Sequence, residues 1–456
     1  MTDNNFNTGG LVVDNRTPDE IHSGQVRMAY RLAEAYAGKL LHVHGIGWHY
    51  WDGKRWAYDD TGAAKRAVVA VLRTALADSL GDKQLASDVR KCESAGGISG
   101  VLDIAAASEE FAATVRDLDA DPHLLNVSNG TLDLRTMEMS PHNPADRITK
   151  VTGGAWNPDT PTGLWEEFLQ RVLPDSDVRQ FLQRYVGYGL SGRVSEHVLA
   201  IWTGTGANGK SVCDNAIRYA LGDYAISCEP NLFMHRDNAH PTGEMDLMGR
   251  RWVTVSESEK GRKLAEATVK RLTGGDTIRA RRMRKDFVQF EPSHTSVLIT
   301  NHLPDVSGDD EALWRRLTVV PFDVVIPEEE RDGTLGARLE LQAEGILAWA
   351  VRGYAEFKLA GLNPPDLVKN ATRDYRNRSG TVGQFINEAC ITGPAVKAKT
   401  QALLAAYRTW SGSAGVAGVT DADFYESLAA HGFKATRTRD GMWRQGIAVE
   451  AGGSND

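Results

Sequence analysis

The chain of 456 residues has few cysteines and no long hydrophobic run. Its four cysteines stand at positions 92, 213, 228 and 390, never as a C-x-x-C pair, which excludes zinc ribbons and disulfide frameworks and favours a reducing cytosol. No apolar run reaches the roughly 18 residues that a membrane span needs, and the polar start MTDNNFNTGG has no signal-peptide pattern. We therefore expect a cytoplasmic protein with no membrane partner.

Positive charge is also in short supply, because 52 Lys and Arg face 60 Asp and Glu for a formal net charge of -8. A surface for nucleic acid must then be a local patch on an acidic protein. The hydrophobic share of 41% and the charged share of 25% are those of an ordinary globular protein and argue against disorder. The length allows about three domains.

Hydrophobic patterning divides the chain into segments of different character. A polar tail precedes a helix and an aromatic hairpin, alanine-rich helices follow, and two short strands flank Asn129-Gly130. The short apolar runs VLAIW, WVTV and SVLIT, with helical or basic segments between them, predict a mostly parallel sheet in an α/β fold. The domains that we expect are a flexible tail (1–24), an α/β domain (25–155), a helical collar (156–197), a core built on the parallel sheet (198–325), a helical segment (326–378) and a winged-helix-like domain (379–456).

The strongest local signal is GTGANGKS, in which Gly204, Gly209, Lys210 and Ser211 match a phosphate-binding loop between a strand and a helix. Glycines let backbone N–H groups turn toward a triphosphate, Lys210 neutralises phosphate oxygens and Ser211 offers a hydroxyl to Mg²⁺. The alternative is a glycine turn with an exposed lysine. The residues predicted to contact ATP are Gly204, Thr205, Gly206, Ala207, Asn208, Gly209, Lys210, Ser211 and Val212.

Polar side chains follow the next two strands. Glu257 and Glu259 come directly after WVTV, where a carboxylate would hold the metal or polarise the attacking water, with Glu257 favoured and Ser211 as the other metal ligand. Asn301 follows SVLIT and could orient the water beside the γ-phosphate. The alternatives are two solvated glutamates and an asparagine that only forms a turn.

Two further features carry positive charge. Arg315 and Arg316 precede an apolar strand, so either could reach the ATP of a neighbouring subunit, unless they are a plain surface pair. Residues 260–285 hold ten basic residues against two acidic ones, and TIRARR and FVQFEP around MRKD predict a basic hairpin that contacts a phosphate backbone without reading sequence. A solvated charged face is the alternative. The predicted DNA contacts are Arg279, Arg281, Arg282, Arg284 and Lys285.

The order GTGANGKS, VTVSESEKG, KRLTGGDTIRARR, LITNHLP and LWRRLTVVPF resembles the superfamily 3 helicase core of phage, plasmid and poxvirus primase-helicases. Upstream WDGKRW and LLNVSNGTLDLRT, and downstream EGILAWAVRGY with GLNPP, resemble the segments that flank that core. The resemblance implies an AAA+ type P-loop fold, a ring that is usually a hexamer, and ATP-driven 3′ to 5′ translocation on single-stranded DNA. It also implies a channel hairpin, and an arginine finger at Arg315 or Arg316.

The chain departs from this family in two places. Relatives often have two adjacent acids at the second motif, whereas a serine separates Glu257 from Glu259, which leaves their division of labour open. Full primase-helicases carry a polymerising domain ahead of the helicase, for which we see no room, so a separate primase or polymerase would supply primers. The Asp117, Asp119 and Asp121 triplet is better explained as a solvated turn than as a two-metal site.

The expected function is that of an ATP-dependent DNA helicase with Mg²⁺, acting in phage or mobile-element replication, in the host bacterial cytoplasm if phage-encoded. Its predicted catalytic residues are Lys210, Glu257, Glu259, Asn301, Arg315 and Arg316. The alternatives are an ATP-regulated replication initiator or loading platform that does not unwind DNA, and a plain ATP-binding interaction protein. The winged-helix-like domain, with a basic hairpin at Asp440-Gly441, could bind either DNA or protein.

Overall fold

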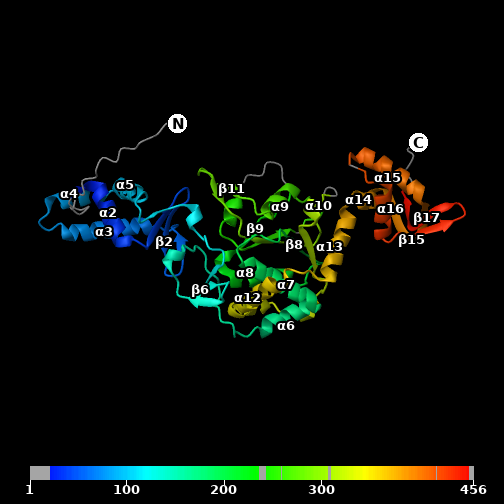
Figure 1. Cartoon of the computed structure of the whole chain (residues 1–456), viewed down its shortest axis with the longest axis horizontal. Coiled ribbons are helices and arrows are strands. Elements are labelled where there is room, and N and C mark those ends of the chain that lie inside the picture. Colours follow the sequence, from blue (N-terminus) through cyan, green and yellow to red (C-terminus); the bar gives the residue numbers. More distant parts are fainter. Residues whose placement is uncertain (1–20, 236–242, 258, 307–309, 417, 451–456) are drawn as a thin grey trace, which may run out of the picture. The chain divides into compact units, whose positions relative to one another are not determined.

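The computed structural model describes residues 21–235, 243–257, 259–306, 310–416 and 418–450, so the expected tail lies mostly outside the described residues. The chain forms two compact units (Figure 1): residues 1–121 with 142–150, and residues 122–141 with 151–456. Within the range 25–155, for which we expected one domain, residues 122–141 and those from 151 onward thus pack with the larger unit. The other expected domain boundaries stay predictions.

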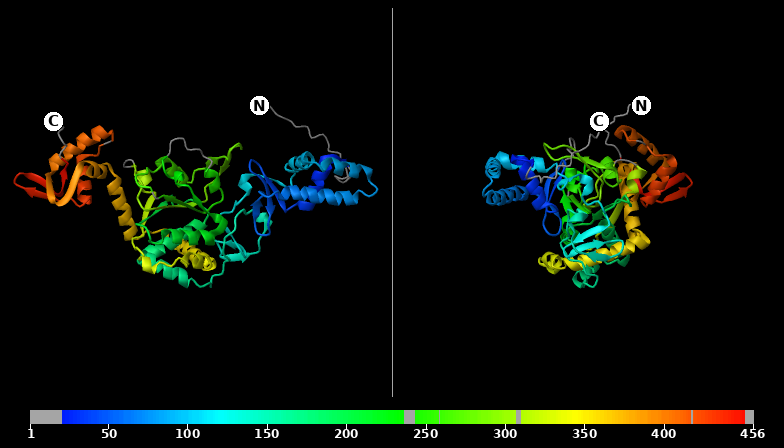
Figure 2. Two further views of the ribbon diagram at one scale, coloured as in Figure 1. Left: turned by 180° about the vertical axis from the view of Figure 1, so that it is seen from behind. Right: turned by 60° about the vertical axis from the view of Figure 1, so that its left-hand side comes forward.

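The smaller unit combines a helical layer with a four-stranded sheet in the order β3-β2-β1-β4. Its helices, which Figures 1 and 2 show gathered on one side of its sheet, are α2 (Gly24–Tyr36), α3 (Ala63–Asp78), α4 (Lys83–Cys92) and α5 (Ala95–Ala105). Its strands are β1 (Leu40–Val43), β2 (Gly47–Trp51), β3 (Trp56–Tyr58) and β4 (Ala112–Ala113). The apolar positions at helical spacing, such as Met28 and Leu32, face a shared core, which confirms the helix, the hairpin and the alanine-rich helices expected here.

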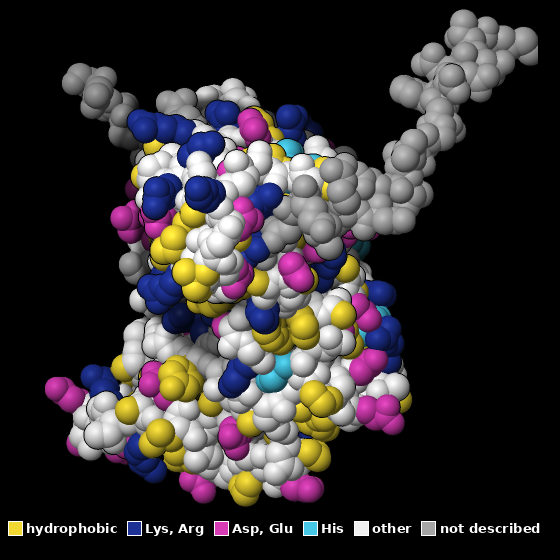
Figure 3. All heavy atoms as spheres, turned by 90° about the vertical axis from the view of Figure 1, so that its left-hand side faces the viewer, with side chains coloured by type: hydrophobic (Ala, Val, Ile, Leu, Met, Phe, Trp, Pro, Cys, Tyr) yellow, Lys and Arg dark blue, Asp and Glu magenta, His cyan; other side chains and the backbone are white. Residues whose placement is uncertain are grey.

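Charge is mixed on the face drawn in Figure 3, where Lys and Arg side chains alternate with Asp and Glu and hydrophobic side chains occur in small groups. This agrees with the modest net charge of -8.

The larger unit is built around a five-stranded sheet in the order β14-β8-β13-β10-β9, and every neighbouring pair of strands is parallel. The strands are β8 (Leu199–Thr203), β9 (Ala225–Cys228), β10 (Trp252–Glu257), β13 (Thr295–Thr300) and β14 (Leu317–Pro321). The predicted parallel sheet and α/β class are confirmed. Only β9, which is short and half-exposed, carries no apolar run that would have identified it.

The strand register aligns the C-terminal ends of three strands, β8, β13 and β10. Thr203 at the end of β8 pairs with Thr300 at the end of β13, and Thr300 pairs with Glu257 at the end of β10. Although β13 comes third in the sequence, it lies between β8 and β10. The segments after these three strands therefore start from one edge of the sheet.

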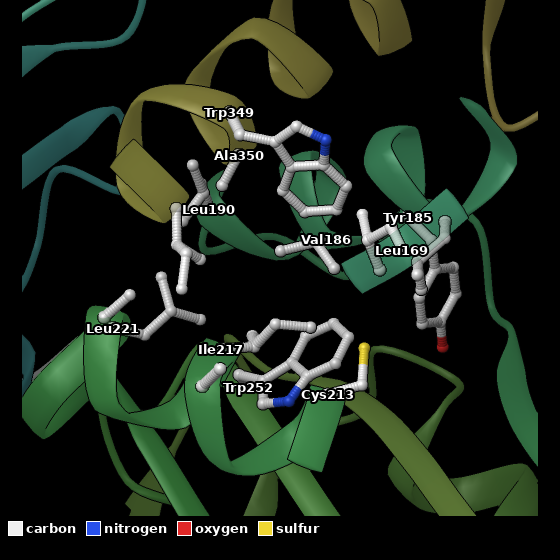
Figure 4. Packing of buried hydrophobic residues seen from close by; sticks show 14 of the residues in the cluster. Leu169, Tyr185, Val186, Leu190, Cys213, Ile217, Leu221, Trp252, Trp349 and Ala350 are labelled. Atoms are coloured by element: carbon white, nitrogen blue, oxygen red, sulfur yellow. The ribbon is translucent and has the colours of Figure 1, made fainter. Parts of the chain in front are cut away.

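One face of this sheet is covered by α6 (Gly163–Val172), α7 (Ser176–Leu190), α8 (Lys210–Leu221) and α12 (Ala343–Ala360). Figure 4 shows how Trp349 of α12, Val186 of α7 and Ile217 of α8 converge above Trp252 of β10. All four side chains are almost fully buried. The phosphate-loop helix α8 is thus fixed from both sides by apolar packing.

Smaller elements complete this region. Strands β5 (Leu124–Val127), β6 (Gly130–Asp133) and β7 (Glu138–Ser140) form a meander that includes the hairpin expected at Asn129-Gly130. The helices are α9 (Glu266–Leu272), α10 (Glu311–Trp314), α11 (Leu335–Glu340) and α13 (Asp366–Ser379). The stretch around Arg373, Arg376 and Arg378, at the end of the segment 326–378 that we expected to be helical, belongs to α13, whose Thr372 Oγ1 accepts a hydrogen bond from Val319 N of β14 at 2.9 Å.

The C-terminal part has its own apolar core, which includes Phe385, Tyr407 and Phe424. Its elements are α14 (Thr381–Ala389), β15 (Cys390–Lys399), α15 (Thr400–Ala414), α16 (Asp421–Ala430), β16 (Ala435–Thr438) and β17 (Gly441–Val449). The hairpin expected at Asp440-Gly441 is confirmed, but strand β15 was not expected, because Gly393 and Pro394 give it the pattern of a loop. A register shift between Thr392 and Lys397 accommodates them.

Helices α7 and α12 cross so closely that a side chain does not fit at Gly187, where an added Cβ would overlap the backbone of Gly353 and Tyr354. We expect Gly187→Ala to lower the free energy of unfolding by about 1–3 kcal/mol, because backbone atoms cannot yield. Thermal or urea unfolding followed by circular dichroism measures the change.

Gly336→Ala is the matched control, because Gly336 also lies in a helix but has open space around its Cα. Alanine is the better helix former, so this variant should be as stable as the parent or slightly more stable. Equal unfolding midpoints for the two variants would contradict the packing of α7 on α12.

Candidate functional site

The predicted phosphate-binding loop connects β8 to α8 in a conformation that depends on its glycines. Gly204 and Gly209 have φ values of 154° and 82°, and Gly209 is the residue that precedes α8. No side chain caps this helix N-terminus, so its first N–H groups remain open to a ligand. An anion is the ligand that such N–H groups and the helix dipole favour.

The chain after β14 holds the loop in place. Asn208 Nδ2 donates to Phe322 O at 3.0 Å, and Ile326 N donates to Ala207 O at 2.8 Å. A Cβ on Gly204 would overlap the same Phe322 carbonyl. Contacts within the chain therefore define the shape of the loop, and Asn208 serves as a brace, a role that its place in the motif did not reveal.

Lys210 is the central charged group of the site, and its side chain is almost entirely buried, with 4% exposed. Its Nζ donates to Gly204 O at 2.8 Å, to Asn208 Oδ1 at 3.0 Å and to Asn301 Oδ1 at 3.2 Å. All three acceptors are neutral, and burial lowers the pKa of the ammonium. A buried cation without a counter-charge is unfavourable, which makes this position a strong attractor for an anion.

Glu257 and Glu259 differ sharply in their surroundings. Glu257 is 6% exposed, and its Oε1 accepts a hydrogen bond from Glu259 N at 2.7 Å. The Glu259 side chain is 68% exposed and pairs with Arg262 Nη1 at 3.1 Å, while Arg262 Nε lies 3.7 Å from Glu257 Oε2. The buried Glu257 is the better placed for chemistry, and Arg262, which we did not predict, links the two carboxylates.

Asn301 lies where it was expected, directly after β13, and joins two motifs through its contact with Lys210. The ends of β8 and β10, at Thr203 and Glu257, are two inter-strand spacings or about 10 Å apart, because β13, which leads to Asn301, lies between them. A hollow of about 1030 Å³ opens at these strand ends, and Thr203, Lys260 and Asn301 are among its lining residues. The structure thus brings together Lys210, Asn301 and Glu257 at one edge of the sheet.

Arg315 and Arg316 lie at the opposite edge of the sheet. They precede Leu317, which pairs with Leu199 at the beginning of β8, while the phosphate loop follows the end of β8. The five residues of β14 separate the two edges by about 16 Å. Arg315 is exposed, whereas Arg316 donates to Ala312 O, and neither is near Lys210 of the same chain.

Helix α13 adds further cations beside Arg315. A cavity of about 310 Å³ is lined by Arg315, Lys369, Arg373 and Arg376, with Glu311 as the carboxylate among its lining residues. Glu311 pairs with Arg376, and Arg373 donates to Asn370 Oδ1 at 2.9 Å. These α13 residues were not among the predicted site residues. The spacing of Val368, Thr372 and Tyr375 is typical of one face of a helix, and this was the available signal.

The basic hairpin predicted between Arg279 and Phe290 is confirmed as β11 (Ile278–Ala280) and β12 (Val288–Phe290), an antiparallel pair. All five predicted DNA contacts are exposed: Arg279, Arg281, Arg282, Arg284 and Lys285. Arg279 and Arg281 both lie 4.6 Å from the ring of Phe287, and Arg282 pairs with Asp246 at 3.3 Å. The hairpin therefore presents a row of cations around one aromatic ring.

The oxygen donors at the sheet edge fit magnesium. Within the described residues, no three His, Cys, Asp or Glu side chains come together to hold a metal by themselves. Mg²⁺ in nucleotide sites takes one or two protein oxygens, and water and phosphate supply the rest. Ser211, exposed in the first turn of α8, and Glu257 would be those protein ligands, and the ion when bound would neutralise phosphate charge.

Comparisons with known proteins show which families and relatives the chain resembles. Residues 29–174 match a family model described as D5 N terminal like, and residues 202–316 match a family of unknown function, DUF5906. The chain is 26% identical over 298 residues to "Putative helicase L207/L206" of Acanthamoeba polyphaga mimivirus, covering 60% of the chain and 31% of that protein. It is 28% identical over 213 residues to "Putative primase C962R" of African swine fever virus, covering 44% and 22%.

The chain resembles the superfamily 3 primase-helicases. The resemblance drawn from its five ordered motifs is thereby confirmed. The chain spans less than a third of the length of the mimivirus and African swine fever virus relatives. Among solved structures, an apo structure of the NrS-1 C terminal region covers 64% of the chain and 76% of its own, at 12% identity and a TM-score of 0.36. No described helix is long and apolar enough to cross a membrane.

Replacing Lys210 tests the site directly. A ligand that binds only the folded protein raises the free energy of unfolding by about 2.7 kcal/mol at a hundred times its Kd. We expect ATP with Mg²⁺ to raise the unfolding midpoint of the parent and to leave that of Lys210→Met unchanged, as measured by differential scanning fluorimetry. The exposed Lys65 in α3 provides the control, because Lys65→Met should keep the full shift. A retained shift in Lys210→Met would rule out this anion site.

Proposed function

We propose that the chain is the motor part of an ATP-dependent DNA helicase. The observation that carries this proposal is the buried Lys210 ammonium, whose partners among the described residues are all neutral and which links the phosphate loop to Asn301. A triphosphate would supply the missing negative charge at the open N-terminus of α8. Viral relatives named as helicases or primases support this assignment.

Each residue at the strand ends has a distinct role in this proposal. The loop from Gly204 to Val212 cradles the phosphates, and Lys210 exchanges its protein acceptors for phosphate oxygens. Glu257 is the general base or magnesium ligand, because its carboxylate is buried while that of Glu259 is neutralised by Arg262 in solvent. Asn301 orients water beside the terminal phosphate. It accepts a hydrogen bond from Lys210 when no phosphate is present and gives up that bond when phosphate binds.

Hydrolysis would take place between two copies of the chain. Arg315 cannot serve the nucleotide of its own chain, because the length of β14 separates it from the phosphate loop. It is exposed and has three further cations beside it on α13, which suits it to meet the phosphates of a neighbour. A closed ring, usually of six copies, would give every copy such a neighbour.

The hairpin β11–β12 would be the element that grips single-stranded DNA. Its arginines offer phosphate contacts, and Phe287 offers an aromatic face. The direction 3′ to 5′ follows from the resemblance to superfamily 3.

The hairpin can be tested through DNA-stimulated hydrolysis. We expect single-stranded DNA to raise the ATPase rate of the parent, and the stimulation to fall steeply as salt rises. Arg281→Glu with Arg284→Glu should remove most of the stimulation and the unwinding of a tailed duplex. The control Lys65→Glu with Arg73→Glu, on the exposed face of α3, should retain both. ATPase activity without any strand separation in the parent would instead favour an initiator or loading platform.

Mixing two inactive variants tests whether Arg315 acts on a neighbour. Arg315→Ala and Lys210→Ala should each lower the ATPase rate by about a thousandfold or more. Mixed in equal amounts, they should recover activity, because roughly a quarter of randomly assembled interfaces would pair an intact Lys210 with an intact Arg315. A mixture as inactive as its components would indicate that both residues must come from one and the same copy of the chain.

A further inference from the structure

The C-terminal part carries acidic and basic residues on different elements. Helix α16 contains Asp421, Asp423 and Glu426 and no basic residue. The strands β15, β16 and β17 contain no Asp or Glu at all, but hold Lys397, Lys399, Arg437 and Arg444. In a winged-helix arrangement α16 would be the helix that enters a DNA groove, and three acids on it oppose that role.

Strand register separates the basic residues into two sets. Arg444 is 5% exposed and donates to Phe433 O and Tyr425 O, so it supports the fold from the inner face. Lys399 lies opposite Trp443, and Lys397 lies opposite Gln445 on the same strand pair. Since directly paired residues share a face and successive residues alternate, these four side chains lie on the outer face.

The outer face is organised around the indole of Trp443. The ammonium groups of Lys397 and Lys399 lie 5.3 Å and 5.7 Å from its ring centre. Both lysines are exposed and Trp443 is half-exposed, and Thr436 pairs with Trp443 from the other neighbouring strand. The aromatic ring therefore holds two cations in place at low entropic cost.

We propose that this outer face of β15, β16 and β17 binds single-stranded nucleic acid. Two ammonium groups without a carboxylate on their sheet attract a phosphate backbone, and an indole on an open surface can stack on an unpaired base. Thr436 and Gln445 add hydrogen-bonding groups beside the ring. A base in a duplex cannot stack in this way, because its faces are already covered.

This surface is an addition to the hairpin β11–β12, and it does not require the motor to work. It would hold a strand while ATP is hydrolysed elsewhere, or before hydrolysis begins. Lys434 and Arg439, which flank β16, would extend the contact along the bound nucleic acid, whereas α16 would not contact it.

The test uses the full chain without nucleotide and an oligothymidylate of about 20 nucleotides. Hydrogen exchange should slow in peptides from 390–399 and 435–449 when the oligonucleotide is added. Lys397→Gln with Lys399→Gln should weaken binding several-fold in fluorescence anisotropy. The slope of log K against log salt should become shallower by about 1.4, because each phosphate contact to a single strand contributes about 0.7.

Substitutions at Trp443 separate stacking from charge. Trp443→Ala should weaken binding about tenfold, and Trp443→Phe should retain most of it, because any aromatic ring offers a stacking face. Asp423→Asn with Glu426→Gln on α16 is the matched control and should not weaken binding. Circular dichroism on every variant verifies the fold.

Three results would overturn the proposal: no protection of the sheet peptides, an unchanged salt slope in the lysine variant, or equal competition by polyglutamate or blunt duplex. Polyglutamate competition would indicate an acidic protein partner instead. Failure here would leave the ATPase and hairpin results untouched, and their failure would leave the protection of this sheet unaffected, so the two proposals can fall separately.

Discussion

The function that we propose for the larger unit depends on the placement of one buried positive charge, the Lys210 ammonium. Lys210 begins α8, but its ammonium reaches back to Gly204 and across to Asn301, so that one side chain joins the phosphate loop to the neighbouring strand. Apolar packing of α7, α12 and β10 around α8 keeps this charge in place. A buried ammonium that has hydrogen-bond partners but no negative counter-charge is energetically costly, and a phosphate group could replace those neutral partners. Empty and occupied states would therefore differ first in the partners of Lys210, with Asn301 as the group that senses the change.

The parallel sheet also creates a constraint on catalysis. Parallel strands put all their carboxyl ends at one edge, where Glu257, Asn301 and the phosphate loop collect, and all their amino ends at the other edge, where Arg315 lies. A cation at the amino edge cannot act on a phosphate at the carboxyl edge of the same sheet. If Arg315 takes part in hydrolysis, the amino edge of one copy must lie against the carboxyl edge of another. Helix α13 is hydrogen-bonded to β14 through Thr372, so its cations would lie at the same contact.

Much of this was predictable from local sequence. The glycine-rich loop, the strands that precede the site residues, the basic hairpin and the hairpin at Asp440-Gly441 each depend on a few consecutive residues, and local rules for turns and apolar runs describe them well. Strand β15 was missed because Gly393 and Pro394 resemble a loop, although pairing with β17 imposes a strand. Helix α13 falls in the segment expected to be helical, but its many charged residues gave no sign that Val368 and Tyr375 would be buried and that its cations would lie beside Arg315. Arg262 gave no sign of its place between Glu257 and Glu259 beyond its presence in a basic stretch.

The sequence by itself determined which residues are candidates for the chemistry, because a phosphate-loop motif and the polar residues after its strands are defined by neighbours along the chain. Only the tertiary structure decided which of these residues meet. The third apolar run became the strand between the first two, which placed Asn301 within reach of Lys210 and put Glu257 two strands away. Burial, which distinguishes Glu257 from Glu259, was decided there as well. Strand order and burial depend on how distant segments pack against one another, and a local pattern of residues carries no information about that choice.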